Sequence, residues 1–158
     1  RNSARNKRCI VHVEGFYEHH HFGKRTYPYF IRLKDHDHFA LAALWEECKN
    51  PATGAALHTF SIVTTEANDL LRRIHNNPKL EGPRMPVILT EAEEAVWLAP
   101  INNDAEEKAI KQLMKPYPTD AMTAVPVRPL LGKDGSGNTE FASDPFMYPE
   151  LLLADPLA

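Results

Sequence analysis

The feature that most constrains the fold is a succession of short strand-like runs within residues 9–64, joined by turns. The runs are rich in β-branched and aromatic residues, as strands are. Turns at residues 34–37 and 50–54 leave no room for the crossover helices that parallel strands require, so the pattern predicts antiparallel pairing. The four runs are Cys9–Val13, Tyr27–Leu33, Phe39–Trp45 and His58–Thr64.

Helical periodicity begins only after these runs. Thr65 is the predicted N-cap of a helix whose apolar residues recur at helical spacing, and His75 follows them as the helix ends before Pro78. Capping boxes at residues 90–93 and 104–107 predict helices that extend to residues 98 and 114. Further strands are expected at residues 85–89 and 123–127.

Composition limits the class of protein. A chain of 158 residues that is 43% hydrophobic and 25% charged is typical of one globular domain. The net charge of −3 provides no global positive field, so any contact with nucleic acid must be local. The sequence lacks an apolar run long enough for a membrane helix, and its two cysteines favour a reducing cytoplasm. We predict a single α+β domain with a mostly antiparallel, barrel-like curved sheet and a few peripheral helices.

A carboxylate and an imidazole are the main candidates for chemistry. Glu18 is expected at a strand end among aromatic residues and histidines, where partial desolvation suits a carboxyl group to proton transfer. His75 emerges beside the buried apolar face of its helix, and its imidazole is a candidate general acid or base. From spacing alone, a surface glutamate and a histidine that caps the helix end remain open alternatives.

The consecutive histidines and the two cysteines do not match the pattern of a metal site or a cysteine nucleophile. His19, His20 and His21 alternate between the faces of an extended chain, so they cannot form a compact metal site. Cys9 lies in a β-branched run as a buried thiol, and Cys48 follows two glutamates that blunt its reactivity. We expect no metal, no cofactor and no cysteine nucleophile at these positions.

The sequence begins with Arg1 rather than methionine, and residues 1–8 are rich in basic side chains. This start predicts a longer parent protein whose N-terminal part precedes the sequence given. The early arginines and Arg84 are candidate phosphate contacts, although single arginines more often lie solvated on a surface.

Taken together, several segments closely resemble the SOS response-associated peptidase (SRAP) family, which senses abasic sites in single-stranded DNA. The resemblance runs in order from Lys7 to Trp97 and becomes loose after Pro100. It implies that residues 1–158 are an SRAP domain without its N-terminal segment, in a cytoplasmic, DNA-associated bacterial protein that is a monomer. The matching segments are Lys7–Val11, Glu14–Glu18, Tyr27–Phe30, Ala42–Trp45, Phe60–Ala67, Ile74–His75 and Arg84–Leu89.

The resemblance implies a covalent reaction with damaged DNA. Family members expose an N-terminal cysteine by autoproteolytic removal of the initiator methionine. The cysteine amine condenses with the ring-opened aldehyde of an abasic deoxyribose, and the thiol closes a thiazolidine that protects the lesion. Both steps require proton transfer.

The family's functional residues match positions of this sequence. Glu18 matches the catalytic glutamate and would protonate the sugar oxygen or the carbinolamine, with His75 as its partner acid or base. Arg84 matches an arginine that holds a DNA phosphate, and Thr64 and Thr65 match residues of a strand-to-helix turn that contacts DNA.

Two departures qualify the match. The loop Asn76–Pro83 separates His75 from Arg84, whereas in many members the histidine is followed almost directly by Arg-Met-Pro. The Met-Cys start and an Asn-Ala-Arg motif would precede Arg1, so the chain alone is expected to be inactive. Two other classes stay open: a non-catalytic single-stranded DNA binding module and a thiol peptidase.

Overall fold

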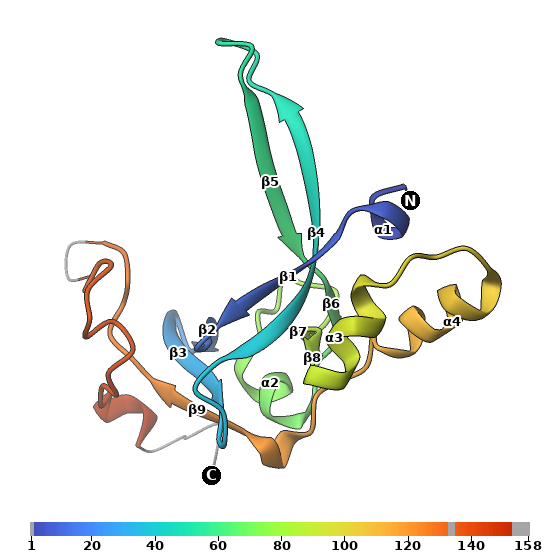
Figure 1. Ribbon diagram of the computed structural model, residues 1–158. Helices are drawn as coiled ribbons and strands as arrows, with labels where there is room; N and C mark the ends of the chain where they lie inside the picture. The colour runs from blue at the N-terminus through green and yellow to red at the C-terminus, as the bar shows by residue number, and fades with distance from the viewer. Residues whose placement is uncertain (1, 133–134, 153–158) are drawn as a thin grey trace. The chain divides into compact units, whose positions relative to one another are not determined.

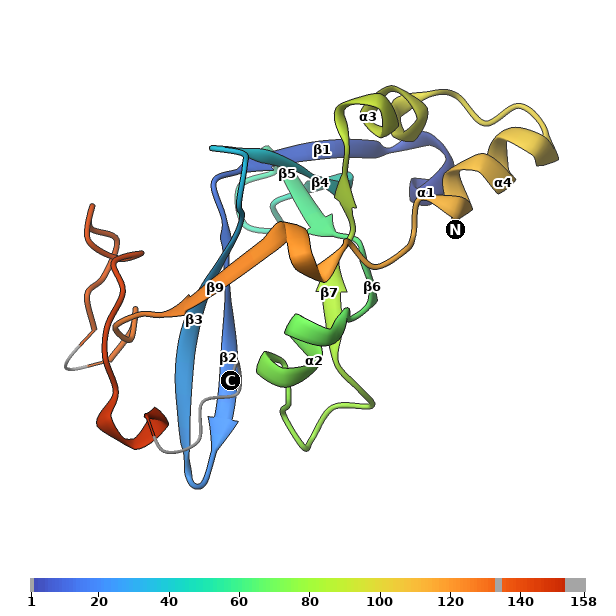
Figure 2. The same ribbon diagram turned by 90° about the horizontal axis from the view of Figure 1, so that it is seen from below.

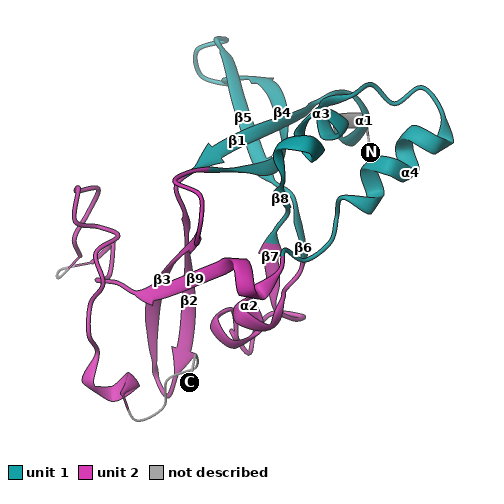
Figure 3. Ribbon diagram, turned by 60° about the horizontal axis from the view of Figure 1, so that its bottom comes forward, with its two compact units in different colours: residues 1–13, 39–65, 86–117 teal, residues 14–38, 66–85, 118–158 magenta. Residues whose placement is uncertain are grey.

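The computed structural model describes residues 2–132 and 135–152, whose helices and strands follow one another as drawn in Figure 1. The chain divides into two compact units (Figure 3). The first unit takes in residues 1–13, 39–65 and 86–117, and the second takes in residues 14–38, 66–85 and 118–158. Each unit is thus assembled from three separated stretches of sequence.

The first unit contains a four-stranded antiparallel sheet arranged around β4 (Phe39–Lys49). The inner half of β4 pairs with β1 (Arg8–Val13) and with β8 (Ile88–Leu89). The outer half pairs with β5 (Ala56–Ile62) in a long hairpin (Figure 1). The inner half is buried and the outer half is exposed, which follows its change from apolar to charged residues.

Three helices accompany this sheet: α1 (Asn2–Asn6), α3 (Glu91–Leu98) and α4 (Asp104–Gln112). The predicted capping box of α3 is confirmed, since the Glu93 carboxylate accepts a hydrogen bond from the Thr90 N–H at 3.0 Å. The first unit's core includes the following buried residues: Ala40, Ala42, Val87, Leu89, Trp97, Ile110 and Leu113.

The second unit contains a three-stranded antiparallel sheet in the order β2 (Phe16–Phe22), β3 (Arg25–Leu33), β9 (Met122–Pro126). Figure 2 shows the helix α2 (Asp69–Ile74) beside β2. Two 3₁₀ turns, η1 (Thr119–Ala121) and η2 (Pro149–Leu151), also belong to this unit.

Strands β6 (Thr64–Glu66) and β7 (Arg84–Pro86) form a separate two-stranded sheet. The single strand expected at residues 85–89 is therefore divided at Val87. Pro86 has no N–H for a ladder, and the Val87 N–H instead donates to the Val63 carbonyl at 2.9 Å.

The structure corrects three expectations about these elements. No sheet of the described residues closes or curls strongly, because the strands are distributed among separate sheets of four, three and two strands. The predicted barrel-like curvature is therefore wrong. The predicted α+β class and antiparallel pairing are confirmed. Asn68, rather than Thr65, caps α2, with its side chain accepting from Leu71 N at 2.9 Å. Asn103, rather than Asp104, caps α4.

Candidate active site

The candidate carboxylate lies in the middle of β2, not beyond a strand end. Glu18 pairs with Tyr29 across the ladder, is half-buried, and accepts a hydrogen bond through Oε1 from the His19 N–H at 2.8 Å. The histidines after it extend β2 as far as Phe22 because β3 pairs with them. Alternate side chains of a strand share a face, so Glu18 lies on the same face as His20.

His20 identifies what this face of β2 contacts. Its ring is buried, and Nδ1 lies 3.0 Å from the carbonyl oxygen of Arg73 in the last turn of α2. The ring also stands edge-on to Tyr29, with 6.1 Å between centroids. The sequence excluded a compact metal site for this histidine run and indicated no other role for it. The contact instead brings the Glu18 face of β2 against the C-terminal end of α2.

Asn76 joins the same two elements through its side-chain amide. Its Oδ1 accepts from the His21 N–H at 2.7 Å, and its Nδ2 donates to the His21 carbonyl at 3.0 Å. A reciprocal pair of hydrogen bonds holds the turn after α2 in one register against β2. Nothing in the sequence pattern distinguished Asn76 from the other polar residues of this loop, because its partner is distant along the chain.

His75 ends α2 and is held at its ring by a residue on β7. Its main-chain N–H donates to the Leu71 carbonyl at 2.7 Å, which makes it the C-cap. Its Nδ1 lies 2.9 Å from both the N and the O of Arg84. Nδ1 can therefore accept from the Arg84 N–H or donate to the Arg84 carbonyl, depending on the tautomer. Either hydrogen bond fixes the orientation of the ring and leaves Nε2 as the ring nitrogen that can contact a ligand.

A pocket of about 500 Å³ opens beside this imidazole. Three of its seven lining residues carry ionisable carboxylate or guanidinium groups, and four of the seven, residues 80–83, belong to the loop Asn76–Pro83. The extra loop therefore forms part of the pocket that contains His75. The lining residues are Glu66, His75, Leu80, Glu81, Gly82, Pro83 and Arg84.

The three remaining predicted site residues differ in their surroundings. Arg84 has an exposed side chain and lines the pocket, while its main chain holds His75. Thr64 is exposed at the start of β6, and Thr65 is buried, with its hydroxyl donating to the Met114 carbonyl at 3.2 Å. The two threonines belong to the first unit, whereas Glu18, His75 and Arg84 belong to the second. Their contacts with DNA stay predictions.

The cysteines lie in different environments. Cys9 is half-buried, and burial raises the pKa of its thiol. Cys48 is exposed, with Sγ 3.6 Å from the Leu57 carbonyl in the β4–β5 hairpin.

Within residues 2–132 and 135–152, no three His, Cys, Asp or Glu side chains gather in a metal-binding arrangement. None of the helices in this part of the chain is long and apolar enough to span a membrane.

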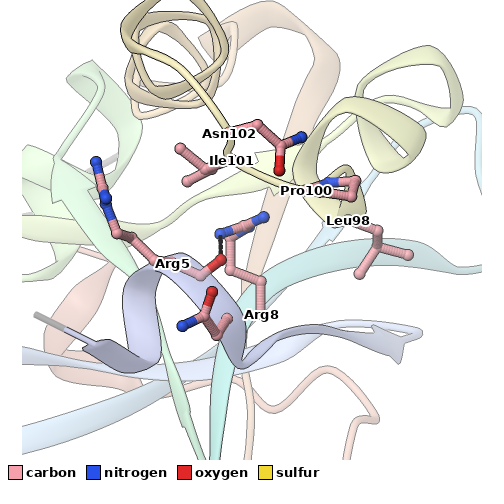
Figure 4. Close-up of a pocket in the computed structure, with 7 residues that line it drawn as sticks. Arg5, Arg8, Leu98, Pro100, Ile101 and Asn102 are labelled. Carbon is pink, nitrogen blue, oxygen red and sulfur yellow. Dashed lines mark hydrogen bonds between the residues drawn. The ribbon is translucent and has the colours of Figure 1, made fainter.

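A second pocket of about 270 Å³ lies in the first unit and contains two of the early arginines (Figure 4). Arg5 forms an ion pair with Glu107 at 2.6 Å. The Arg8 guanidinium donates to carbonyls at the ends of α1 and α3, where a cation stabilises the helix dipole, and burial lowers its pKa. Arg8 therefore joins these elements. Its acceptors are the carbonyls of Ala4, Arg5, Trp97 and Ala99.

The fold and this geometry define an α+β protein with a half-buried carboxylate and a tethered imidazole in one unit. The family model described as SOS response associated peptidase (SRAP) matches residues 1–134. The chain belongs to the SRAP family, which confirms the resemblance of its motifs.

Curated relatives agree with this assignment. Abasic site processing protein YoqW of Bacillus subtilis is 37% identical over 136 residues, covering 85% of this chain and 56% of the relative. Abasic site processing protein HMCES of Gallus gallus is 29% identical over 131 residues, covering 70% and 35%. The chain thus spans about half the length of the Bacillus relative that it matches.

The fold is also similar to that of crystallised proteins. A protein from Bacteroides thetaiotaomicron superimposes with a TM-score of 0.79 at 35% identity, over 93% of this chain and 60% of that one. A protein from Bordetella bronchiseptica gives a TM-score of 0.68 at 25% identity, over 80% and 58%.

Proposed function

We propose that this chain provides the proton-transfer residues and part of the DNA contacts of a protein that crosslinks abasic sites in single-stranded DNA. Membership of the SRAP family supports the class of reaction. The names of the Bacillus and Gallus relatives, abasic site processing proteins, support the substrate. The observation that carries the proposal is the tether between the His75 ring and the main chain of Arg84.

The tether suits His75 to act as either acid or base. When Nδ1–H donates to the Arg84 carbonyl, Nε2 has a lone pair and can take a proton. When Nδ1 accepts from the Arg84 N–H, Nε2 carries a proton and can hydrogen-bond a substrate oxygen. Both tautomers use the same ring position, so no rotation accompanies the exchange. Geometry of this kind favours general acid–base catalysis.

The reaction requires several such transfers. Opening of the abasic sugar breaks the bond between C1 and the ring oxygen; the ring oxygen gains a proton, and the C1 hydroxyl loses one to become the aldehyde. Attack by an amine gives a carbinolamine, which is protonated and loses water to leave an iminium ion. Addition of the thiol sulfur to that carbon then closes the thiazolidine and releases the thiol proton. We assign the acid steps to Glu18 and the matching base steps to His75.

The crosslinking cysteine of the family lies at the mature N-terminus, a position that neither Cys9 nor Cys48 occupies. The proposed reaction therefore belongs to a protein that joins this chain to such a segment. Arg84 would contact a phosphate of the bound strand, with Thr64 and Thr65 contributing polar contacts.

The test uses residues 1–158 joined to a Met-Cys N-terminal segment and single-stranded DNA with one abasic site. Covalent adduct is measured over time on a denaturing gel. We expect Glu18→Gln and His75→Ala to slow adduct formation by roughly 10²-fold or more, while Glu14→Gln, a change at a nearby exposed glutamate, leaves it unaltered.

Each contrary result has a defined meaning. A folded wild-type protein that forms no adduct refutes the proposal. If it also binds intact and abasic strands equally well, it is a non-catalytic binding module. Turnover of a peptide library would identify a thiol peptidase instead.

A further inference from the structure

The outer half of the β4–β5 hairpin is an exposed two-stranded ribbon. β1 pairs with β4 only from Phe39 to Leu44, whereas β5 continues the pairing out to Lys49 (Figure 1). Every β4 residue from Trp45 outward is exposed, as are the β5 residues opposite them. An isolated hairpin of this kind gains little stability from its own packing. Apolar side chains on it therefore need an explanation other than the core.

Two aromatic side chains lie on one face of this ribbon. Trp45 and Phe60 are directly opposite in the antiparallel register, and opposite residues share a face. Trp45 is 37% exposed and Phe60 is 61% exposed. The next pair outward on this face is polar, with His58 Nε2 at 2.9 Å from a carboxylate oxygen of Glu47. We call Trp45 and Phe60 the aromatic pair.

The size of the aromatic pair limits what it can bind. A whole aromatic side chain presents about 150–250 Å². The exposed fractions of Trp45 and Phe60 therefore amount to on the order of 200 Å² of apolar surface. A stable protein interface needs about 800 Å² from each partner. The polar pair beyond it prevents the apolar surface from extending along the ribbon. A patch of this size suits one or two flat rings.

A positive charge lies beside the aromatic pair. The Lys7 ammonium is 5.3 Å from the centroid of the Trp45 ring and also forms an ion pair with Glu46. The Lys7 side chain remains 35% exposed, so an anion can approach it. Aromatic rings with a cation close to them are the arrangement by which proteins hold single-stranded nucleic acid, because bases stack on the rings and phosphates meet the cation.

We propose that the aromatic pair stacks unpaired bases of single-stranded nucleic acid, with Lys7 contacting the adjoining phosphate. The choice of nucleic acid rests on the proposed function, but the surface needs no abasic site. It would hold undamaged nucleotides of the strand by their bases. Stacking on aromatic rings accepts any base, so this contact would add affinity without sequence preference.

Tryptophan fluorescence of the chain itself tests the proposal. The sequence has two tryptophans, and Trp97 is only 1% exposed, so quenching by an added ligand reports on Trp45. The probes are a short oligothymidylate and an oligonucleotide of the same length made only of tetrahydrofuran abasic residues. We expect the first to quench Trp45 with the same midpoint as binding measured by anisotropy. The second carries the same phosphates without bases, so it should bind more weakly.

Variants separate base stacking from other effects. Trp45→Ala and Phe60→Ala should each weaken oligothymidylate binding by about tenfold, and Trp45→Phe should restore most of the affinity. Leu57→Ala is the matched control, since Leu57 is 47% exposed on the other face of the same hairpin, opposite Cys48. Circular dichroism confirms that each variant is folded.

Three results would overturn the proposal: equal binding of the base-free oligonucleotide, unchanged affinity in Trp45→Ala, or equal loss in Leu57→Ala. Self-association of the chain that disappears in Trp45→Ala would assign the aromatic pair to a contact between copies instead. The proposed function is judged separately by the covalent adduct. An adduct without Trp45 quenching refutes this inference alone, and quenching without an adduct refutes the proposed function alone.

Discussion

Replacing Asn76 by alanine should loosen the β2–α2 junction that positions the candidate active site. The substitution removes two hydrogen bonds to the His21 main chain, of 2.7 Å and 3.0 Å. A hydrogen bond in a folded protein contributes about 0.5–1.5 kcal/mol net. Asn76 is exposed, so water can replace both partners. We therefore expect the local opening free energy to fall by about 1–2 kcal/mol.

Amide hydrogen exchange of His21 measures this loss directly, because the His21 N–H donates the hydrogen bond that the Asn76 side chain accepts. A fall of about 1.4 kcal/mol corresponds to roughly tenfold faster exchange. In a protein joined to the Met-Cys segment, adduct formation should slow as well, since His75 adjoins the released turn. Little change is expected in the first unit.

Asn77→Ala provides the matched control. Asn77 also has an amide side chain, but its Oδ1 accepts from the Lys79 N–H at 3.0 Å within the same loop. His21 exchange should stay at the wild-type rate in this variant. Unchanged His21 exchange in Asn76→Ala, or equal acceleration in both variants, would refute the positioning role of Asn76.

Three further outcomes are expected. Gly15→Ala should destabilise the protein by about 1–3 kcal/mol in urea unfolding, because a Cβ there would lie 2.4 Å from the Phe30 ring; wild-type stability would contradict this. Hydrogen bonds and charge interactions with Arg5 and Lys111 lower the pKa of the Glu107 carboxyl to about 2. The stabilisation that this carboxylate contributes is therefore present above about pH 4.5 and is lost as the pH falls toward 2. The thermal midpoint should therefore fall less on acidification in Glu107→Gln than in wild type. In native buffer a thiol reagent should modify exposed Cys48 first, since burial raises the pKa of Cys9; equal rates would exclude this difference.

Local patterns were predictable from the sequence. Apolar runs gave strands close to β1, β3, β4, β5 and β9 because alternation and β-branching act within a few residues. The capping box at Thr90 and the helix end at His75 were predictable for the same reason. The family was recognisable from short motifs, whose order along the chain does not depend on knowing the fold.

Boundaries and partners were less predictable. Three consecutive histidines resemble a loop, yet they belong to β2 because β3 supplies hydrogen bonds along their whole length. Thr65 and Asn68 are both favourable N-cap residues by type. Asn68 caps α2 because Thr65 is part of the strand β6. Each outcome depended on a neighbour that competes for the same main-chain groups.

The sequence by itself determined the α+β class, the antiparallel pairing and the identity of Glu18 and His75 as candidates. Only the tertiary structure decided that no sheet of the described residues closes, that Asn76 joins α2 to β2, and that Arg84 holds the His75 ring. The physical reason is range. Propensity and periodicity act over a few neighbouring residues, whereas Asn76 and His21 meet across 55 positions of the chain, and only packing brings them together.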